Sequence, residues 1–191
     1  MKTKFSLHNK VVVLTGGGSG IGKAMATTFA ARGAEVHILD FNLDAANDTV
    51  AEIIKAGFKA KAYQCNVADY KQVSEIINLI ADASTVDMLI NNAGIAHVGN
   101  IEVCAAEDLD RLYEVNIKGV YNCAKACIPL MKDNGGGVIL NIASDLGVIA
   151  PDQRIYQVNH LPSNEQPVKP VTYSVSKHAI IGLTKYLATY W

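Results

Sequence analysis

The sequence predicts an α/β fold: a doubly wound parallel sheet covered by helices on both faces, in three α/β/α layers. Short apolar runs rich in β-branched residues alternate with longer segments whose apolar residues recur at helical spacing. Such alternation is typical of right-handed crossovers onto a parallel sheet. A chain of 191 residues, of which 50% are hydrophobic and 18% charged, suits a single folded domain over residues 1–191.

The first elements follow from local pattern. Val11–Thr15 is an uninterrupted apolar run, which predicts a buried strand. The segment Ile21–Arg32 is rich in alanine and stops before Gly33, a residue typical of helix ends. Val36–Asp40 is then predicted as the second strand, and Asp44–Ala56 as a helix with an apolar stripe on one face.

The remaining elements repeat this order. The predicted strands are short and apolar, and the predicted helices carry apolar residues three and four positions apart. Gly119 and Pro129 weaken the longest predicted helix. The strands are Ala60–Cys65, Met88–Asn91 and Val138–Ile142, and the helices are Tyr70–Asp82, Ala105–Lys132 and Tyr173–Tyr190.

The segment Pro151–Pro170 interrupts the alternation and contains four of the five prolines. It can form neither a regular helix nor a central strand, so we expect a long ordered loop inserted at about residues 150–171. Loops of this length inside a compact domain are usually functional or mobile.

Composition excludes several classes of protein. A net charge of −1 argues against electrostatic binding of nucleic acid. The apolar runs are too short to span a bilayer, and the basic N-terminus has no apolar signal segment behind it, so we expect a cytoplasmic protein. Four cysteines lack disulfide or zinc spacing, which predicts reduced thiols and no metal site.

A glycine-rich turn, Thr15–Gly22, directly follows the first strand and precedes a helix. Glycines let a pyrophosphate approach the backbone, and the free N–H groups of the helix N-terminus attract its charge. Gly22 lets the helix lie close to the strand. The alternative of a nucleotide triphosphatase phosphate loop, Gly17-x4-Gly22-Lys23, lacks the required hydroxyl because Ala24 comes next.

Asp40 ends the second predicted strand, where an acidic side chain accepts hydrogen bonds from the adenosine ribose hydroxyls. Its charge would repel a 2′-phosphate, and the next residue, Phe41, supplies no cation. The sequence therefore favours NAD over NADP.

Tyr173 and Lys177 are four residues apart and share one face of the last predicted helix. Tyrosine is ordinarily a poor acid or base at neutral pH, but an adjacent ammonium group favours the phenolate form. This pair predicts a general acid/base.

Together these features resemble the short-chain dehydrogenase/reductase family, in the group with a Thr-Gly-x3-Gly-x-Gly turn and a Tyr-x3-Lys motif. The matching turn residues are Thr15, Gly16, Gly20 and Gly22, and Asn91-Asn92-Ala93-Gly94 matches the motif after the fourth strand. The resemblance covers Lys10 to Trp191 and implies a Rossmann-type fold, NAD as cofactor, and hydride transfer with a secondary alcohol or ketone.

The resemblance also implies the site residues. Asn116 would hold a proton-relay water through its backbone, Ser144 would bind the reacting oxygen, and Tyr173 would be the acid/base assisted by Lys177. The implied cofactor-binding residues are Gly16, Ser19, Gly20, Ile21, Gly22, Asp40, Asn66, Val67, Asn92, Ala93, Gly94, Tyr173 and Lys177.

Three departures from the family pattern affect these expectations. Asn66 stands where the family usually has an Asp that binds adenine, and an amide oxygen can accept the same hydrogen bond. Ser144 and Tyr173 are farther apart than usual; Tyr156 is at the usual distance but has His160 in place of the lysine, so we expect it to be a loop residue. The chain ends at Trp191, before the family's sixth strand and substrate lid, and we therefore expect a C-terminally truncated fold.

The expected substrate is a small alcohol or carbonyl compound, including sugar derivatives, since the proline-rich loop is similar to loops of relatives in bacterial surface-sugar pathways. Arg154, His160 and His97 are candidate substrate contacts. The family commonly forms dimers and tetramers, which implies a homo-oligomer. The alternative is an NAD-binding fragment or non-catalytic assembly domain without a complete substrate site. A nucleotide-sugar epimerase would need a differently spaced glycine turn.

Overall fold

The structure is a computed structural model that describes residues 5–96, 101–102, 104–162 and 165–190. The described chain forms two compact units. Unit 1 comprises residues 5–93 and 118–142, and unit 2 comprises residues 94–117 and 143–190. Each unit is therefore built from two separate stretches of chain.

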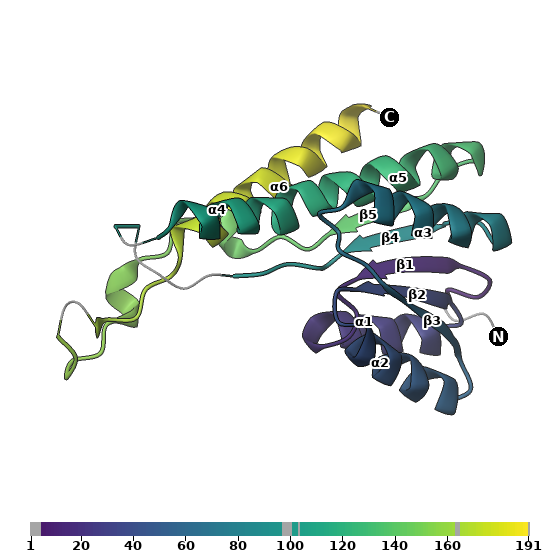
Figure 1. The fold of residues 1–191 in the computed structure, drawn as a ribbon, viewed down its shortest axis with the longest axis horizontal. Helices are drawn as coiled ribbons and strands as arrows, with labels where there is room; N and C mark the ends of the chain where they lie inside the picture. Colours follow the sequence, from purple (N-terminus) through teal and green to yellow (C-terminus); the bar gives the residue numbers. More distant parts are fainter. Residues whose placement is uncertain (1–4, 97–100, 103, 163–164, 191) are drawn as a thin grey trace. The chain divides into compact units, whose positions relative to one another are not determined.

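Unit 1 is a five-stranded parallel sheet in the order β3-β2-β1-β4-β5. Figure 1 shows α1 and α2 on one face, and α3 and α5 on the other. This arrangement confirms the predicted doubly wound, three-layer sheet. The elements are β1 (Val11–Thr15), α1 (Gly20–Ala31), β2 (Glu35–Asp40), α2 (Leu43–Lys55), β3 (Lys59–Gln64), α3 (Tyr70–Ala83), β4 (Met88–Asn91), α5 (Gly119–Asp133) and β5 (Val138–Asn141).

The core of unit 1 follows from strand alternation. In the register of β1 and β2, Val12 lies opposite Val36 and Leu14 lies opposite Ile38. All four side chains point to the face covered by α1 and α2, where small residues such as Ala26 let the helices approach the sheet. This packing fixes the carboxyl ends of β1 and β2, which carry the glycine turn and Asp40.

The predicted long helical stretch Ala105–Lys132 is present, and it contains one π-helical turn. The structure has α4 (Ala106–Tyr113), a π-helix (η1, Glu114–Lys118) and α5 in place of one continuous α-helix. The side chain of Asn116, inside the π-helix, bonds the backbone of Ile95, a tertiary contact that propensity cannot reveal. Gly119 then lies so close to Val67 that an added Cβ would fall 2.6 Å from its Cγ2 atom.

Unit 2 contains α4, two short 3₁₀ helices and the last helix. These are η2 (Asp145–Gly147), η3 (Gln153–Tyr156) and α6 (Val171–Tyr190), which begins two residues earlier than predicted. Both α4 and η2 pack against α6. The helix starts directly after Pro170. Proline restricts the residue before it to extended conformations, so a helix rarely extends to the N-terminal side of a proline.

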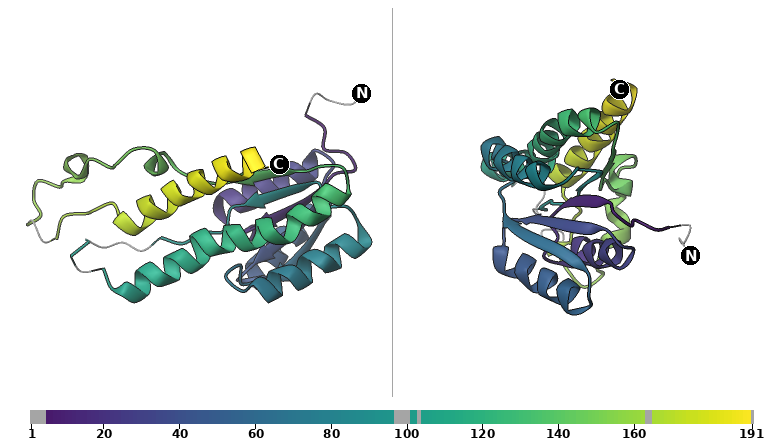
Figure 2. Two further views of the ribbon diagram at one scale, coloured as in Figure 1. Left: turned by 90° about the horizontal axis from the view of Figure 1, so that it is seen from above. Right: turned by 90° about the vertical axis from the view of Figure 1, so that its right-hand side faces the viewer.

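The proline-rich arm, Pro151–Pro170, leaves η2 and returns to the start of α6 (Figure 2). Two glutamine side chains join its two legs. Gln153 accepts from the Lys169 backbone N–H at 2.9 Å and donates to the Lys169 carbonyl at 3.2 Å. Gln166 does the same with Val158, at 2.7 and 2.9 Å. The described part of the arm is thus ordered by amide pairs that replace a strand ladder.

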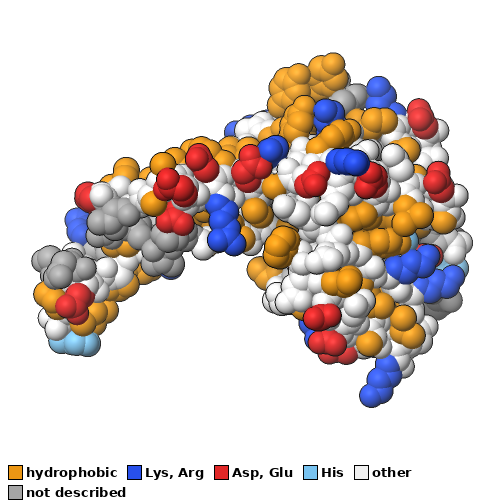
Figure 3. All heavy atoms as spheres, viewed as in Figure 1, with side chains coloured by type: hydrophobic (Ala, Val, Ile, Leu, Met, Phe, Trp, Pro, Cys, Tyr) orange, Lys and Arg blue, Asp and Glu red, His pale blue; other side chains and the backbone are white. Residues whose placement is uncertain are grey.

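The surface carries charges of both signs. Figure 3 shows acidic and basic side chains interspersed over the visible face, in keeping with a net charge of −1. No helix among the described residues has both the length and the apolar character needed to cross a membrane.

Candidate functional site

The glycine turn of unit 1 is shaped by close approaches that only glycine permits. Gly16 has φ +68, and a Cβ there would fall 2.9 Å from the Cα atom of Ala93. A Cβ on Gly22 would collide with the carbonyl oxygen of Gly16. Ser19 precedes α1 without capping it through its side chain, so the side chain leaves the N–H groups of the first turn available.

Thr15 and Asn92 join this turn to the end of β4. The Thr15 hydroxyl accepts from the backbone N–H groups of Asn92 and Ala93, at 3.1 and 3.0 Å. The Asn92 side chain donates to the carbonyls of Thr15 and Gly16, at 3.1 and 2.9 Å. These bonds hold the turn in place against β4. The sequence identified both residues by motif but did not reveal the double acceptor role of Thr15.

Asp40 lies at the carboxyl end of β2, beside the glycine turn. Its Oδ2 atom accepts from the Gly18 N–H at 2.8 Å, and its Oδ1 atom accepts from the Asn42 N–H at 2.9 Å. The carboxylate is half-buried. The structure therefore places the Asp40 carboxylate, held by two backbone N–H groups, next to the glycine turn.

The remaining unit 1 residues of the predicted cofactor site have differing surroundings. Asn66 uses its side-chain oxygen to accept from the Ala68 N–H at 3.1 Å. Val67 is buried against α5, and Asn122 donates to its carbonyl at 2.9 Å. Gly20 and Ile21 are exposed at the start of α1. Asn66 and Val67 lie on the loop after β3, and Gly20 and Ile21 begin the helix after β1, so all four lie beyond the carboxyl ends of parallel strands.

Tyr173 and Lys177 meet on the first turns of α6 in unit 2. The Lys177 Nζ atom lies 5.4 Å from the centroid of the Tyr173 ring. Lys177 is only 7% exposed, and this burial lowers the pKa of its ammonium group. The predicted i, i+4 pairing is thus present, on a buried lysine.

Ser144 is brought to the same helix by η2. Its hydroxyl donates to the Asp145 carboxylate at 2.7 Å and accepts from the Leu146 N–H at 3.2 Å. A Cβ on Gly147 would fall 2.8 Å from the Lys177 carbonyl oxygen, so η2 packs directly on the turn of α6 that carries the lysine. The bond to Asp145, whose pKa it lowers, was not predicted.

Asn116 is buried, and its side chain is fully engaged. Its Oδ1 atom accepts from the Ile95 N–H, and its Nδ2 atom donates to the Ile95 carbonyl, both at 2.8 Å. The same Nδ2 atom donates to the Ser176 hydroxyl at 3.2 Å. Unit 2 therefore contains all four residues of the predicted catalytic set. The helix η2, which follows Ser144, packs on the turn of α6 that carries Lys177, and Ser176 links Asn116 to the Tyr173 backbone.

The candidate substrate contacts Arg154, His160 and His97, and the loop residue Tyr156, lie in the arm or outside the described residues. Arg154 forms a two-point ion pair with Asp152, with bonds of 2.6–3.1 Å. Tyr156 lies under the Lys169 ammonium group, 4.7 Å from Nζ to the ring centroid. His160 is exposed, and His97 is outside the described residues. The structure thus gives Arg154 an internal partner.

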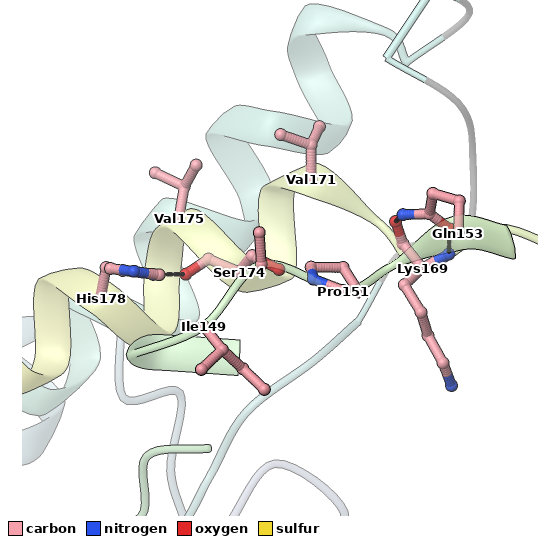
Figure 4. A pocket seen from close by; sticks show the side chains of 9 residues that line it. Ile149, Pro151, Gln153, Lys169, Val171, Ser174, Val175 and His178 are labelled. Atoms are coloured by element: carbon pink, nitrogen blue, oxygen red, sulfur yellow. Dashed lines mark hydrogen bonds between the residues drawn. The ribbon is translucent and has the colours of Figure 1, made fainter. Parts of the chain in front are cut away.

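A pocket of about 520 Å³ lies between the root of the arm and α6 (Figure 4). Its walls are mainly apolar and include Ile149, Pro151, Val171 and Val175, with Ser174 and His178. The His178 ring bonds the Ser174 carbonyl at 2.9 Å. Because Tyr173 and Lys177 do not line it, the pocket is a feature separate from the tyrosine–lysine pair.

The parallel sheet, the glycine turn and the acidic end of β2 define a Rossmann-type protein of the nucleotide-binding class. The sequence matches the short chain dehydrogenase family over residues 10–191. The chain belongs to this family.

Several relatives have known names. The chain is 39% identical to an oxidoreductase of Thermotoga maritima, described as uncharacterized, over 96% of this chain and 66% of the relative. It is 30% identical to a D-threitol dehydrogenase of Mycolicibacterium smegmatis, over 98% of this chain and 66% of the relative. The chain thus spans about two thirds of the length of these relatives.

The fold also matches solved structures. One, from Beutenbergia cavernae, is described as an NAD(P)-dependent gluconate 5-dehydrogenase with NADP bound at low occupancy. It superposes with a TM-score of 0.84 at 30% identity and covers 98% of this chain and 68% of its own. The printed names of all three proteins describe oxidoreductases or dehydrogenases.

Proposed function

We propose that the protein is an NAD-dependent dehydrogenase or reductase that interconverts a secondary alcohol and a ketone. The observation that carries this proposal is the buried Lys177 ammonium group 5.4 Å from the Tyr173 ring. A positioned cation favours the phenolate, which lets a tyrosine exchange protons near neutral pH.

The residues of unit 1 fit a dinucleotide. The Gly16 and Gly22 positions have no room for a Cβ, whereas nothing among the described residues lies within 4 Å of where a Cβ on Gly20 would project. Backbone N–H groups at Ser19, Gly20 and Ile21 would hold the pyrophosphate, with Asp40 on the adenosine ribose. When bound, the nicotinamide accepts or donates hydride. The roles of Asn66, Val67, Asn92, Ala93 and Gly94 in holding it are part of the proposal.

The residues of unit 2 would handle the substrate proton. Tyr173 takes the proton from the alcohol or returns it to the ketone oxygen. Ser144, once its hydroxyl turns from Asp145, donates a hydrogen bond to the same oxygen. Lys177 stabilises the phenolate and, by resemblance to the family, also holds the nicotinamide ribose. Asn116 extends the proton path through its backbone.

Asp40 supports NAD over NADP. Its carboxylate is held by Gly18 and Asn42, so it cannot easily turn aside from an incoming 2′-phosphate. Repulsion between the two negative charges disfavours NADP. The NADP in the Beutenbergia structure belongs to that protein.

A polyol or sugar derivative is the proposed substrate class. D-threitol and gluconate appear in the names of two relatives, and both are polyhydroxylated compounds. By analogy with the family we also propose a homo-oligomer.

The test is the substitution Tyr173→Phe. We expect the variant to bind NADH as the wild type does, because the ring is retained. The turnover rate should fall by about two to four orders of magnitude, the usual contribution of a general acid/base. Turnover is measured as NAD reduction with a panel of polyols and secondary alcohols, and binding as NADH fluorescence.

The matched control is Tyr156→Phe. Tyr156 also lies beneath a lysine but belongs to the arm, so its substitution should leave turnover unchanged. Near-normal rates in Tyr173→Phe would overturn the assigned role. A wild-type chain that binds NADH but oxidises no alcohol of the panel would favour the alternative, a non-catalytic nucleotide-binding protein.

A further inference from the structure

We propose that Ser176 is a positioning residue that fixes the turn of α6 carrying Tyr173 and Lys177. Its buried hydroxyl joins the Asn116 amide to the backbone carbonyl of Tyr173. This inference rests on the proposed function, and it adds a residue outside the four predicted catalytic positions.

The first part of the connection is the Asn116 amide. Asn116 is 3% exposed, and its oxygen and one N–H bond the Ile95 backbone at 2.8 Å each. Such a reciprocal pair fixes the amide plane, because the oxygen and the nitrogen of the side chain are both held by the backbone of one residue, Ile95. The second N–H of the amide then points at the Ser176 oxygen, 3.2 Å away.

The second part is the Ser176 hydroxyl. Ser176 has no exposed surface, and its oxygen donates to the Tyr173 carbonyl at 2.8 Å. A serine bond to a carbonyl three residues back is common in helices and by itself only local. Here the same oxygen also accepts from Asn116, which is 60 positions away in sequence. The Ser176 hydroxyl therefore links the Asn116 side chain to the Tyr173 backbone through two hydrogen bonds.

The consequence concerns the tyrosine–lysine pair. Ser176 lies between the two residues in sequence, and its bonds set the carbonyl of the first and the helical turn that leads to the second. Without the hydroxyl, the Asn116 N–H loses a buried acceptor and the Tyr173 carbonyl loses a donor. The ring and the ammonium group would then be held less closely together.

The experiment compares Ser176→Ala with Ser174→Ala in the full chain. Ser174 lies on the same helix, and its hydroxyl has no hydrogen-bond partner among the described residues. The two substitutions remove the same atom from the same helix, so a difference between them reports the hydrogen bonds of Ser176 to Asn116 and to the Tyr173 carbonyl. The readouts are amide hydrogen exchange, NADH affinity, and the pH profile of kcat/KM.

We expect Ser176→Ala to speed hydrogen exchange over residues 173–177 and to weaken NADH binding at most severalfold, because the proposed ribose contact of Lys177 is loosened. Its kcat should fall about tenfold, the rate equivalent of one buried hydrogen bond. The acidic limb of the kcat/KM profile should move to higher pH, because a looser lysine favours the phenolate less. Ser174→Ala should match the wild type in all three.

An exchange pattern and pH profile of Ser176→Ala equal to those of Ser174→Ala would overturn the proposal. If Ser176→Ala does not fold, Ser176→Cys retains a γ-atom and replaces the hydroxyl with a weaker hydrogen-bonding group. Ser176→Cys should then show smaller changes in the same direction in hydrogen exchange, kcat and the pH profile. Wild-type values of all three would overturn the proposal. Hydrogen exchange needs no turnover, so the Ser176 connection is tested even if the wild type proves inactive.

Discussion

At the scale of single residues, the polar side chains at the ends of β1 and β2, Thr15 and Asp40, each accept two backbone hydrogen bonds. The Thr15 hydroxyl accepts two N–H groups from the segment after β4, and the Asp40 carboxylate accepts one from the glycine turn and one from the start of α2. Each group therefore shapes the backbone and, at the same time, presents chemistry at the carboxyl edge of the sheet.

The charge of Asp40 is the basis of the first residue-scale prediction. In Asp40→Asn the hydrogen-bond acceptor at Oδ1 remains, but the repulsion of a 2′-phosphate is removed. The ratio of the NADP to the NAD dissociation constant should fall about tenfold or more. Fluorescence titration with NADH and NADPH measures the ratio, and Asp48→Asn on the exposed face of α2 is the control. An unchanged ratio would show that Asp40 does not determine cofactor preference.

At the scale of elements, the arm shows how a segment without regular structure can be ordered. Its legs are joined at Gln153 and Lys169 and again at Val158 and Gln166. A side-chain amide carries the same donor and acceptor as a peptide group, so each glutamine substitutes for one residue of a missing strand.

We predict that Gln153→Ala loosens the arm at its root. Two hydrogen bonds to Lys169 are lost, so limited proteolysis should cut within residues 151–170 several times faster than in the wild type. The thermal midpoint should change little, because the bonds are exposed. Gln157→Ala, on an exposed arm residue outside these pairs, should be cut at the wild-type rate. Equal cleavage of the two variants would contradict the role assigned to Gln153.

At the scale of the whole molecule, stability depends on pH through a buried histidine in the sheet. His37 is 1% exposed; its Nδ1 atom lies 3.0 Å from the Tyr63 hydroxyl, and its Nε2 atom 3.3 Å from Glu35. Burial lowers the pKa of His37, and Lys61 adds to this, whereas Glu35 opposes it. The folded state therefore favours the neutral ring more than the unfolded state does.

The sign of the effect follows from this direction. Stability from the neutral ring is complete above the ordinary histidine pKa of 6.5 and is lost as the pH falls below it. The urea midpoint should thus decrease between pH 7.5 and 5.5. This pH range lies above the titration of Glu35. Burial would raise the pKa of Glu35, but the ion pair with Lys61 lowers it, and the net direction is down. In His37→Gln the decrease should be smaller, and in His8→Gln, at an exposed histidine, it should persist. Identical slopes in both variants would exclude His37 as the source.

Much of the fold follows from local pattern, because the determinants are local. All five strands were predictable from short apolar runs, with ends displaced by at most one residue, as for β2, which starts at Glu35 instead of Val36. The π-helix at Glu114–Lys118 was not predicted; its residue Asn116 bonds the backbone of Ile95, which is distant in sequence. A tertiary partner of this kind leaves no periodic signal in the sequence.

Some features of the candidate site could likewise be predicted from the sequence, and others could not. The pairing of Tyr173 with Lys177 follows from helical geometry, and the approach of Gly22 to Gly16 from the motif. The bonds from Ser144 to Asp145 and from Asn116 to Ser176 depend on side-chain rotamers and on packing. The predicted cofactor contacts remain predictions, because they concern a group that the chain alone does not contain.

The division of unit 2 into two separate stretches of chain bears on its biosynthesis. Ile95 and Asn116 emerge from the ribosome well before Ser176, the partner of Asn116 in α6. The β1 to β4 ladder can pair while synthesis continues, whereas the Asn116 amide cannot bond Ser176 until α6 has been made. Nascent chains stalled before residue 176 would therefore carry an assembled sheet and an unfinished tyrosine–lysine turn.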